Sequence, residues 1–554
     1  MTSPTQFADY IVVGGGIGGS VVASRLTQRD TKLAVILLEA GSDPTNHPLV
    51  PDASTALQVR GTELNWNYTT IDQENLGGRA CNASAGKALG GGSAINSGGW
   101  IRGDAKDYDH WAKVVNDPRW SYKGFLPYFR KTETYHDAGA DRAQHGFSGP
   151  IHTQTAPTSN RNYPMREQTK AAFNSIGIKE IKDANCGNPQ GLAECTEAWK
   201  NGKRQLASHA YPLNGVQVMT GKLVKRVIIE EKDNRKVALG VELSDGSILG
   251  ATREVILCAG TYRTPQVLML SGIGSASELL KHNIPQILDL PEVGKNLHDH
   301  LGTTQFWKLR NPEKGLSAGS PNFNNPAYML GLPLDWVAVH TVPAQGLKDA
   351  LVHDGEMASL DVSHTQLDDR SQLEFYIIYA AASADPPIPF DGTHISSSVV
   401  GLLPTSRGSV TISSNNPHDD PVIDPNYYAT EHDKYVMRSG LKLVGKMLLE
   451  TQEGLNIVTQ EAVPDGLKPL SSILNDEDLD ARVRASGNTL FHPGGTASMG
   501  KVVDSHLRVI GIEGLRIVDA SVIPVPIASH YQACIFALGE QAVDLILDHV
   551  EEKV

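Results

Sequence analysis

The stretch Ala8-Asp-Tyr-Ile-Val-Val-Gly14-Gly-Gly16-Ile-Gly18-Gly19-Ser20 predicts the fold of this 554-residue chain. Its first six residues (8–13) are typical of a short buried strand, and the glycines after them have the spacing Gly14-x-Gly16-x-x-Gly19. Gly14 permits a tight turn, Gly16 lets a pyrophosphate approach the backbone, and Gly19 lets the following helix pack against the strand. The free N–H groups and the dipole at the start of that helix favour phosphate binding.

The residues that follow complete the unit. Apolar residues at helical spacing continue through Leu26, and a second strand is predicted at residues 33–38, ending at Glu39. An acidic residue about 20 positions after the last glycine is expected to bind ribose hydroxyls. We therefore predict a dinucleotide site that also includes Ile17, Gly18 and Ala40. The unit by itself does not distinguish FAD from NAD.

The length and composition of the chain predict two joined globular domains, with 40% hydrophobic and 20% charged residues. The formal net charge of −13 argues against a nucleic-acid partner, because phosphate binding requires a basic face. No apolar run reaches the roughly 20 residues that span a bilayer. Residues 1–7 do not resemble a signal peptide, so we expect a cytoplasmic or other intracellular protein; a secreted form without its leader stays open.

The five cysteines form neither a CxxC pair nor a metal-like cluster, and we predict no metal site. Cys186 and Cys195 are close enough in sequence for a disulfide within one loop, which is left open. Asn67 and Asn82 match the N-glycosylation pattern, which matters only in a secreted protein.

Two further glycine clusters follow. The first is Gly86-Lys-Ala-Leu-Gly-Gly-Gly-Ser-Ala-Ile-Asn96, where bare backbone lets a flat or anionic group approach closely. The second lies within residues 254–274 and is interpreted as a strand, a glycine turn at Gly260 and a helix that begins at Pro265.

These clusters resemble motifs of the glucose–methanol–choline (GMC) oxidoreductase family. Six ordered segments carry the resemblance: residues 86–103, 260–274, 293–300, 406–427, 491–500 and 514–521. The resemblance implies an α/β fold, in which a Rossmann-like FAD-binding domain is interleaved with an α+β substrate-binding domain containing an antiparallel sheet. Residues 1–155, 205–305 and 490–554 are assigned to the FAD-binding domain, and residues 156–204 and 306–489 to the substrate-binding domain. The sheet is expected around residues 371–378 and 399–412, with residues 311–354 as a variable lid.

The same resemblance implies FAD as the cofactor. Gly90 to Asn96 would lie along the flavin, Asp519 and Ala520 would hold the pyrophosphate and ribityl region, and the backbone of Val224 would contact adenine. The remaining predicted cofactor contacts are Leu89, Gly90, Gly91, Ser93, Ser97, Gly98, Gly99, Ala259, Gly260, Tyr531 and Gln532.

Two positions depart from the family pattern. Ile95 occupies the position from which some members tether the flavin through a histidine, so FAD is expected to be bound non-covalently. Gly92 stands where a serine or cysteine is common, which removes a side-chain hydrogen bond.

Alcohol oxidation requires a base for the hydroxyl proton, and histidine suits this role because its ordinary pKa is about 6.5. Among 19 histidines, His492 and His530 occupy the places of the family's catalytic pair. His492 is the predicted base, and His530 is predicted to hydrogen-bond the substrate oxygen. Alternatively, His530 only precedes a helix and has no chemical role. His298 and His300 are interpreted as structural.

The predicted activity is oxidation of a small-molecule alcohol, with oxygen as acceptor and hydrogen peroxide as product. A dehydrogenase that uses a quinone or another acceptor is the closest alternative, and a non-redox flavin-containing lyase or cyclase is a third. The light-driven decarboxylase of the family is disfavoured, because the histidine pair has the alcohol-oxidising form. An aryl or other hydrophobic primary alcohol is the preferred substrate.

Overall fold

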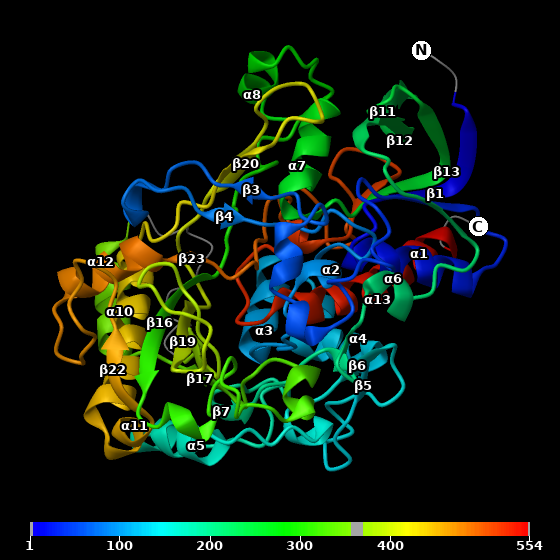
Figure 1. Ribbon diagram of the computed structural model, residues 1–554. Helices are drawn as coiled ribbons and strands as arrows, with labels where there is room; N and C mark the ends of the chain where they lie inside the picture. The colour runs from blue at the N-terminus through cyan, green and yellow to red at the C-terminus, as the bar shows by residue number, and fades with distance from the viewer. Residues whose placement is uncertain (1–3, 356–368, 552–554) are drawn as a thin grey trace.

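The computed structural model describes residues 4–355 and 369–551, which fold around two large sheets. In Figure 1 the strands β1, β11, β12 and β13 lie at the upper right, and β16, β17, β19 and β22 lie at the lower left. Each sheet has seven strands. The arrangement confirms the predicted α/β fold with a separate antiparallel sheet.

The first sheet is built around the glycine-rich turn. Its strand order is β10-β2-β1-β13-β12-β11, with β24 paired to β13. The strands β10, β2, β1, β13 and β24 are parallel to their neighbours, whereas β12 and β11 are antiparallel. All four residues of β2 are buried, as expected for a parallel strand covered on both faces. The bounds are β1 Gln6–Val13, β2 Val35–Leu38, β10 Val216–Met219, β11 Val224–Lys232, β12 Arg235–Leu243, β13 Ile248–Leu257 and β24 Leu515–Ile517.

The two ends of the chain meet beside this sheet. Helix α1 (Ile17–Arg29) follows the glycine turn and packs against the C-terminal helix α13 (Tyr531–Glu551), which also contacts α4 (Tyr122–Thr132). Figure 1 shows the blue α1 and the red α13 on the same side of the molecule.

Helix α7 (Gly260–Leu270) begins five residues before the predicted start, and Pro265 lies inside it. The prediction of a proline-initiated helix was therefore wrong. A proline inside a helix leaves the carbonyl four residues earlier without its N–H donor. Here that carbonyl belongs to Thr261, and it accepts a hydrogen bond of 2.6 Å from the hydroxyl of Thr496. The side-chain donor allows the helix to continue.

The second sheet is antiparallel throughout, in the order β22-β16-β19-β18-β17-β7, with β23 paired to β16. Helix α10 (Glu431–Gly445) covers β18 and β19, and α5 (Arg166–Ser175) contacts β17. The strand bounds are β7 Gly191–Glu194, β16 Leu301–Leu309, β17 Trp336–His340, β18 Leu373–Ile378, β19 His394–Gly401, β22 Val458–Ala462 and β23 Asn488–Thr489.

Two predictions about this region need correction. The expected strand region 399–412 is divided, because β19 ends at Gly401 and β20 (Ser409–Thr411) pairs with β21 (Val422–Asp424) in a separate sheet. The expected lid at residues 311–354 contains β17, which lies between β18 and β7, and helix α9 (Ala344–His353). Those parts belong to the framework of the sheet.

The remaining elements are short. The other helices are α2 Gly92–Ile95, α3 Ala105–Val114, α6 Ala207–Ala210, α8 Ala276–Lys281, α11 Gln452–Ile457 and α12 Asp476–Ser486. The small strand pairs are β3 Tyr68–Thr69 with β4 Asn82–Ala83, β5 Glu133–Tyr135 with β6 Ile151–Thr153, β8 Trp199–Lys200 with β9 Lys203–Arg204, and β14 Ile273–Gly274 with β15 Leu288–Asp289.

All five cysteines are free thiols, so the disulfide considered between Cys186 and Cys195 does not form in the structure. Across residues 4–355 and 369–551, no helix has the length and apolar character needed to cross a membrane.

Candidate active site

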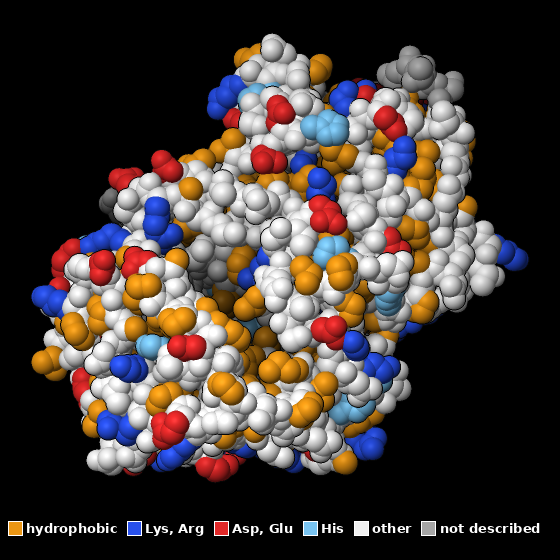
Figure 2. Space-filling view, viewed as in Figure 1, with side chains coloured by type: hydrophobic (Ala, Val, Ile, Leu, Met, Phe, Trp, Pro, Cys, Tyr) orange, Lys and Arg blue, Asp and Glu red, His pale blue; other side chains and the backbone are white. Residues whose placement is uncertain are grey.

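A cavity of about 570 Å³ lies between the glycine turn and the antiparallel sheet, with residues of both sheets in its wall. In Figure 2 the surface between the two halves is hollowed, and hydrophobic side chains gather in the hollow. Most of the predicted site residues line the cavity: Gly14, Gly16, Ile17, Gly18, Glu39, Ala40, Gly91, Asn96, Ser97, Gly98, Gly99, Val224, Ala259, Gly260, His492, Asp519, Ala520, His530, Tyr531 and Gln532.

Four predicted contacts lie behind this wall and support its loops. Gly19 packs on the carbonyl of Gly14, where a Cβ would lie only 2.0 Å from that oxygen. The Ser93 hydroxyl donates to the Gly90 carbonyl at 2.6 Å and accepts from the Ala207 N–H at 2.9 Å. Leu89 is buried in the core around the first sheet.

The two glycine clusters meet at one point of the cavity wall. Gly14 has a φ of 104°, and a Cβ there would lie 2.3 Å from the Cys258 carbonyl oxygen. Gly91 has a φ of 52°, and its Cβ would lie 2.6 Å from the Cα of Gly16. Only glycine fits such close backbone approach. The turn therefore presents bare backbone to the cavity, which suits a pyrophosphate.

Glu39 lies beside this turn with its carboxylate buried. One oxygen accepts from the Gly15 N–H at 2.9 Å and the other from the Gly41 N–H at 2.8 Å. Burial raises the pKa of Glu39 to about 7, although these hydrogen bonds oppose the shift. Each carboxylate oxygen retains a further lone pair, so ribose hydroxyls have acceptors here.

Asp519 joins two distant motifs. Its carboxylate accepts from the Gly260 N–H at 2.9 Å, from the Thr264 hydroxyl at 2.6 Å and from the Ser521 N–H at 2.8 Å. These bonds fix the start of α7 against the segment after β24. The Asp519–Ala520 backbone consequently lies in the wall of the same cavity as Gly14.

The two departures from the family pattern both face the cavity. Ile95 lines it and is 6% exposed. Gly92 also lines it, and a Cβ at Gly92 would have no neighbour within 4 Å. The missing side chain therefore leaves open space beside the glycine cluster.

The two predicted catalytic histidines lie side by side in the cavity wall. Their ring centroids are 4.7 Å apart. The His492 N–H donates to Asp299 Oδ1 at 2.9 Å, and His492 Nδ1 lies 3.0 Å from His300 Nδ1. Within the described residues, His492 Nε2 has no hydrogen-bond partner. This nitrogen is therefore free to bind a ligand in the cavity.

The surroundings of His492 keep its ring neutral. Burial, followed by the charges of His530, His300 and Arg60, holds its pKa well below the usual 6.5. Burial also lowers the pKa of His300 to about 3. Two neutral rings share one proton in a hydrogen bond, so donation from His492 Nδ1 to His300 leaves the Nε2 lone pair available.

His530 is held by a carboxylate that the sequence analysis missed. His530 Nε2 lies 2.9 Å from Glu374 Oε1, and Glu374 is 1% exposed. On the other side, a Cβ at Gly99 would lie 2.7 Å from His530 Nδ1, so glycine gives the ring its room. The signal for Glu374 was present in β18, where it is a lone charge in the apolar run Leu373–Ile378.

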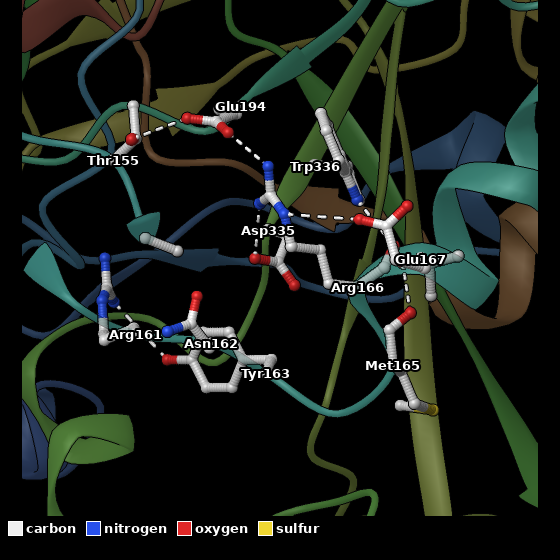
Figure 3. A network of polar contacts seen from close by, with 12 residues as sticks. Thr155, Arg161, Asn162, Tyr163, Met165, Arg166, Glu167, Glu194, Asp335 and Trp336 are labelled. Carbon is white, nitrogen blue, oxygen red and sulfur yellow. Dashed lines mark hydrogen bonds and ion pairs between the residues drawn. The ribbon is translucent and has the colours of Figure 1, made fainter. Parts of the chain in front are cut away.

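An apolar part of the cavity wall comes from residues 332–334, just before β17. Figure 3 shows Arg166 reaching both Glu194 and Asp335, and its Nη1 donates to Asp335 Oδ1 at 2.8 Å. At the other end, the Leu332 N–H donates to Glu197 at 2.9 Å, and its carbonyl accepts from Arg161 at 3.1 Å. Ion pairs thus hold both ends of this wall.

Comparison with known proteins identifies the family. Models described as GMC oxidoreductase match residues 8–302 and 404–539. The chain belongs to the GMC oxidoreductase family. Membership confirms the predicted family and the predicted FAD cofactor, and it makes the protein an enzyme of a flavin-dependent oxidoreductase family.

Three GMC proteins illustrate the similarity. The GMC-type oxidoreductase acuG of Aspergillus aculeatus is 43% identical, over 97% of this chain and 99% of that protein. A formate oxidase from Aspergillus oryzae, in a structure that concerns modification of its FAD, superposes with a TM-score of 0.86 at 28% identity, covering 100% of both chains. A fungal aryl-alcohol oxidase superposes with a TM-score of 0.80 at 25% identity, covering 98% of this chain and 99% of that one.

Proposed function

We propose that this enzyme oxidises the CH–OH group of a small-molecule alcohol to an aldehyde or ketone, with oxygen as the final acceptor and hydrogen peroxide as product. The observation that carries the proposal is the Nε2 of His492, which has no partner among the described residues, on a ring that lines the same cavity as the nucleotide turn. FAD, when bound, supplies the acceptor for the hydride that leaves the carbinol carbon.

His492 is the proposed base. Because its ring is neutral, Nε2 can accept the hydroxyl proton as the hydride leaves the carbon. The bond from the backbone N–H of His492 to Asp299 holds the backbone, and the contact of its ring Nδ1 with His300 fixes the direction of Nε2. His300 is therefore proposed as a positioning residue.

His530 is the proposed second member of the pair. Its ring lies beside His492, and with Nε2 held by Glu374 its Nδ1 is the nitrogen that would hydrogen-bond the substrate oxygen and limit how the alcohol is oriented. Glu374 holds this ring through Nε2. This contact with a buried carboxylate fixes the orientation of the His530 ring beside His492.

The cofactor would be held by residues already placed in the wall. The Gly14–Gly18 backbone would bind the pyrophosphate, Glu39 the ribose, Asp519 and Ala520 the pyrophosphate and ribityl region, and Val224 adenine. Ile95 has no atom suited to a covalent link, so we propose non-covalent FAD. Acid precipitation should release all the flavin into the supernatant; flavin that stays with the pellet would contradict this.

The substrate is proposed to be an aryl or similarly hydrophobic alcohol. Ile101, Leu334, Val337, Tyr376 and Phe491 give the catalytic end of the cavity a mainly apolar surface. The similarity to a fungal aryl-alcohol oxidase supports the same substrate class.

The test is anaerobic mixing of the yellow protein with benzyl alcohol and aliphatic primary alcohols. We expect loss of flavin absorbance, fastest with the aromatic alcohols, and rapid recovery with peroxide formation when air is admitted. Absorbance that is lost but recovers only with a quinone would replace the oxidase by a dehydrogenase. If no alcohol changes the flavin absorbance, the proposed function is wrong.

A further inference from the structure

Arg60 places a positive charge at the catalytic end of the cavity. It belongs to a short 3₁₀ helix (Gln58–Gly61), and its guanidinium carbon lies 4.1 Å from the centroid of the Phe491 ring. Phe491 directly precedes His492, and all three side chains line the cavity. The charge of Arg60 is also among the causes that depress the pKa of His492. Arg60 and the proposed base therefore share one part of the site.

No carboxylate in residues 4–355 or 369–551 forms an ion pair with Arg60. Its Nη2 donates to Ser97 Oγ at 3.1 Å, and its Nε donates weakly to the Ile95 carbonyl at 3.4 Å. A guanidinium has five N–H donors, so three have no partner in the described structure. Partial burial of a cation with unpaired N–H donors costs free energy unless an anion pairs with it.

The other lysine and arginine residues in the cavity wall each have fewer uncommitted donors than Arg60. Lys222 forms an ion pair with Asp245 at 2.9 Å. Arg263 donates to Tyr68 Oη at 2.6 Å and to the side chain of Gln266 and the Pro417 carbonyl at 2.7 Å. Arg60 is thus the lining cation with the most uncommitted donors in the described residues.

We propose that Arg60 binds a carboxylate of the substrate, and that the substrate is an aromatic alcohol bearing this acid group. The proposal rests on the alcohol oxidation proposed above and specifies its substrate class. A planar guanidinium fork matches a carboxylate with two parallel hydrogen bonds. Phe491 and Tyr376 offer aromatic faces next to the fork.

A carboxylate suits the site better than a phosphate ester. A phosphate carries about −1.5 to −2 charges at pH 7. Arg60 lines the cavity, whereas Arg204, whose pKa its charge helps to lower, is not among the lining residues. Ile95, Tyr376 and Phe491 are the lining residues that interact with Arg60 through a carbonyl or an aromatic ring. One carboxylate balances one guanidinium, whereas a phosphate would leave negative charge in an apolar wall.

The first test compares meta- and para-(hydroxymethyl)benzoate with their methyl esters in anaerobic flavin reduction. The compared quantity is the rate constant of flavin reduction divided by the dissociation constant of the alcohol. In the wild type, and for the isomer that reacts better, we expect this quantity to be about 10- to 100-fold larger for the acid than for its ester. Arg60→Met should abolish this preference, so that a variant that still binds FAD oxidises the acid and its ester with similar efficiency. Arg60→Lys, which keeps the charge but loses the fork, should give an intermediate preference.

The matched control is Arg235→Met, because Arg235 is 58% exposed in its side chain and pairs with Glu513 on the surface. It should keep the wild-type preference. Equal rates for acids and esters in the wild type, or an unchanged preference in Arg60→Met, would overturn the proposal.

The second test is binding without turnover. Benzoate should perturb the flavin absorbance of the wild type with a dissociation constant at least about tenfold lower than that of benzamide, and Arg60→Met should remove the difference. Inorganic phosphate that competes as well as benzoate would overturn the choice of carboxylate. Because binding is independent of oxidation, benzoate that binds through Arg60 in a protein that oxidises no alcohol would refute the proposed function alone.

Discussion

Replacement of His492 by alanine removes the proposed base with little other change to the wall. The hydrogen bond to Asp299 comes from the backbone N–H, which alanine retains. The substitution deletes the ring that contacts His300 and His530. We therefore expect His492→Ala to remain folded, yellow and loaded with FAD.

A positioned general base contributes about 10²- to 10⁴-fold to a rate, which corresponds to about 2.7–5.5 kcal/mol of activation free energy. His492→Ala should slow anaerobic flavin reduction by this factor. The pH dependence of the rate of flavin reduction provides an independent test of this role. Burial and neighbouring positive charges hold the pKa of His492 well below 6.5, so protonation of the wild-type base should slow reduction only in acid. Without the base, the rate should rise with hydroxide concentration, by about tenfold per pH unit.

The assay is stopped-flow flavin absorbance at saturating alcohol between pH 6 and pH 9. His353→Ala is the control, because its side chain is 75% exposed and lies on α9. It should match the wild type throughout. A His492→Ala variant that reduces its flavin at the wild-type rate, with the wild-type pH profile, would refute His492 as the base.

Three further predictions concern residues that line the cavity or support its wall. Glu39→Gln should raise the FAD dissociation constant about 10- to 150-fold at pH 8 but much less at pH 6, because ribose favours the ionised carboxylate and the pKa of Glu39 is about 7. Titration of the apoprotein with FAD at both pH values measures this effect. An equal effect at the two pH values would contradict a role for the carboxylate charge. His530→Ala should slow flavin reduction and lower the melting temperature, because it leaves buried Glu374 without its partner. His530→Asn keeps a hydrogen-bond donor, so both effects should be smaller. If both variants reduce flavin at the wild-type rate, His530 is purely structural. Glu197→Gln should lower the free energy of unfolding, measured in urea, by about 3–5 kcal/mol, because buried Arg161 loses its counter-charge. The double variant Arg161→Met with Glu197→Leu should recover much of the lost stability. If Glu197→Gln is as stable as the wild type, this ion pair does not hold the cavity wall.

The nucleotide turn was predictable because its signal is local. Gly14, Gly19 and Glu39 follow directly from strand ends and glycine spacing, and the structure gives each glycine a steric reason. The first strand spans Gln6–Val13 where residues 8–13 were predicted. Local sterics of this kind are encoded within a few residues, so one sequence suffices to find them.

Glu374 and Arg60 were missed because long-range contacts bring them to the cavity, whereas His300 was interpreted as structural and its contact with His492 was not foreseen. Glu374 reaches it through β18, whose alternate residues Glu374, Tyr376 and Ile378 all line the wall. The sheet that sets this face pairs β18 with β17 and β19. Arg60 lies in a short 3₁₀ segment with no repeating pattern. A lone charge inside an apolar strand is the one signal that pointed to Glu374.

The lid prediction was wrong for part of residues 311–354, for a related reason. Proline and glycine in residues 311–354 were interpreted as a variable lid, yet Trp336–His340 forms an interior strand of the sheet. Ion pairs at Arg161 and Arg166 hold the residues before this strand (Figure 3). Composition did not reveal these partners, because Glu194 and Glu197 lie more than 100 residues earlier in the chain.

The low pKa of His492 and the free donors of Arg60 have a common consequence. A histidine ring whose pKa is strongly depressed is neutral near pH 7, but it accepts a proton only weakly. Part of that depression comes from the charge of Arg60, after burial and the other two histidines. A carboxylate bound to Arg60 would offset this charge and raise the proton affinity of His492 just when the alcohol is in place. A neutral alcohol would then be disfavoured twice, first in binding and again in proton transfer, so one guanidinium would act on both steps.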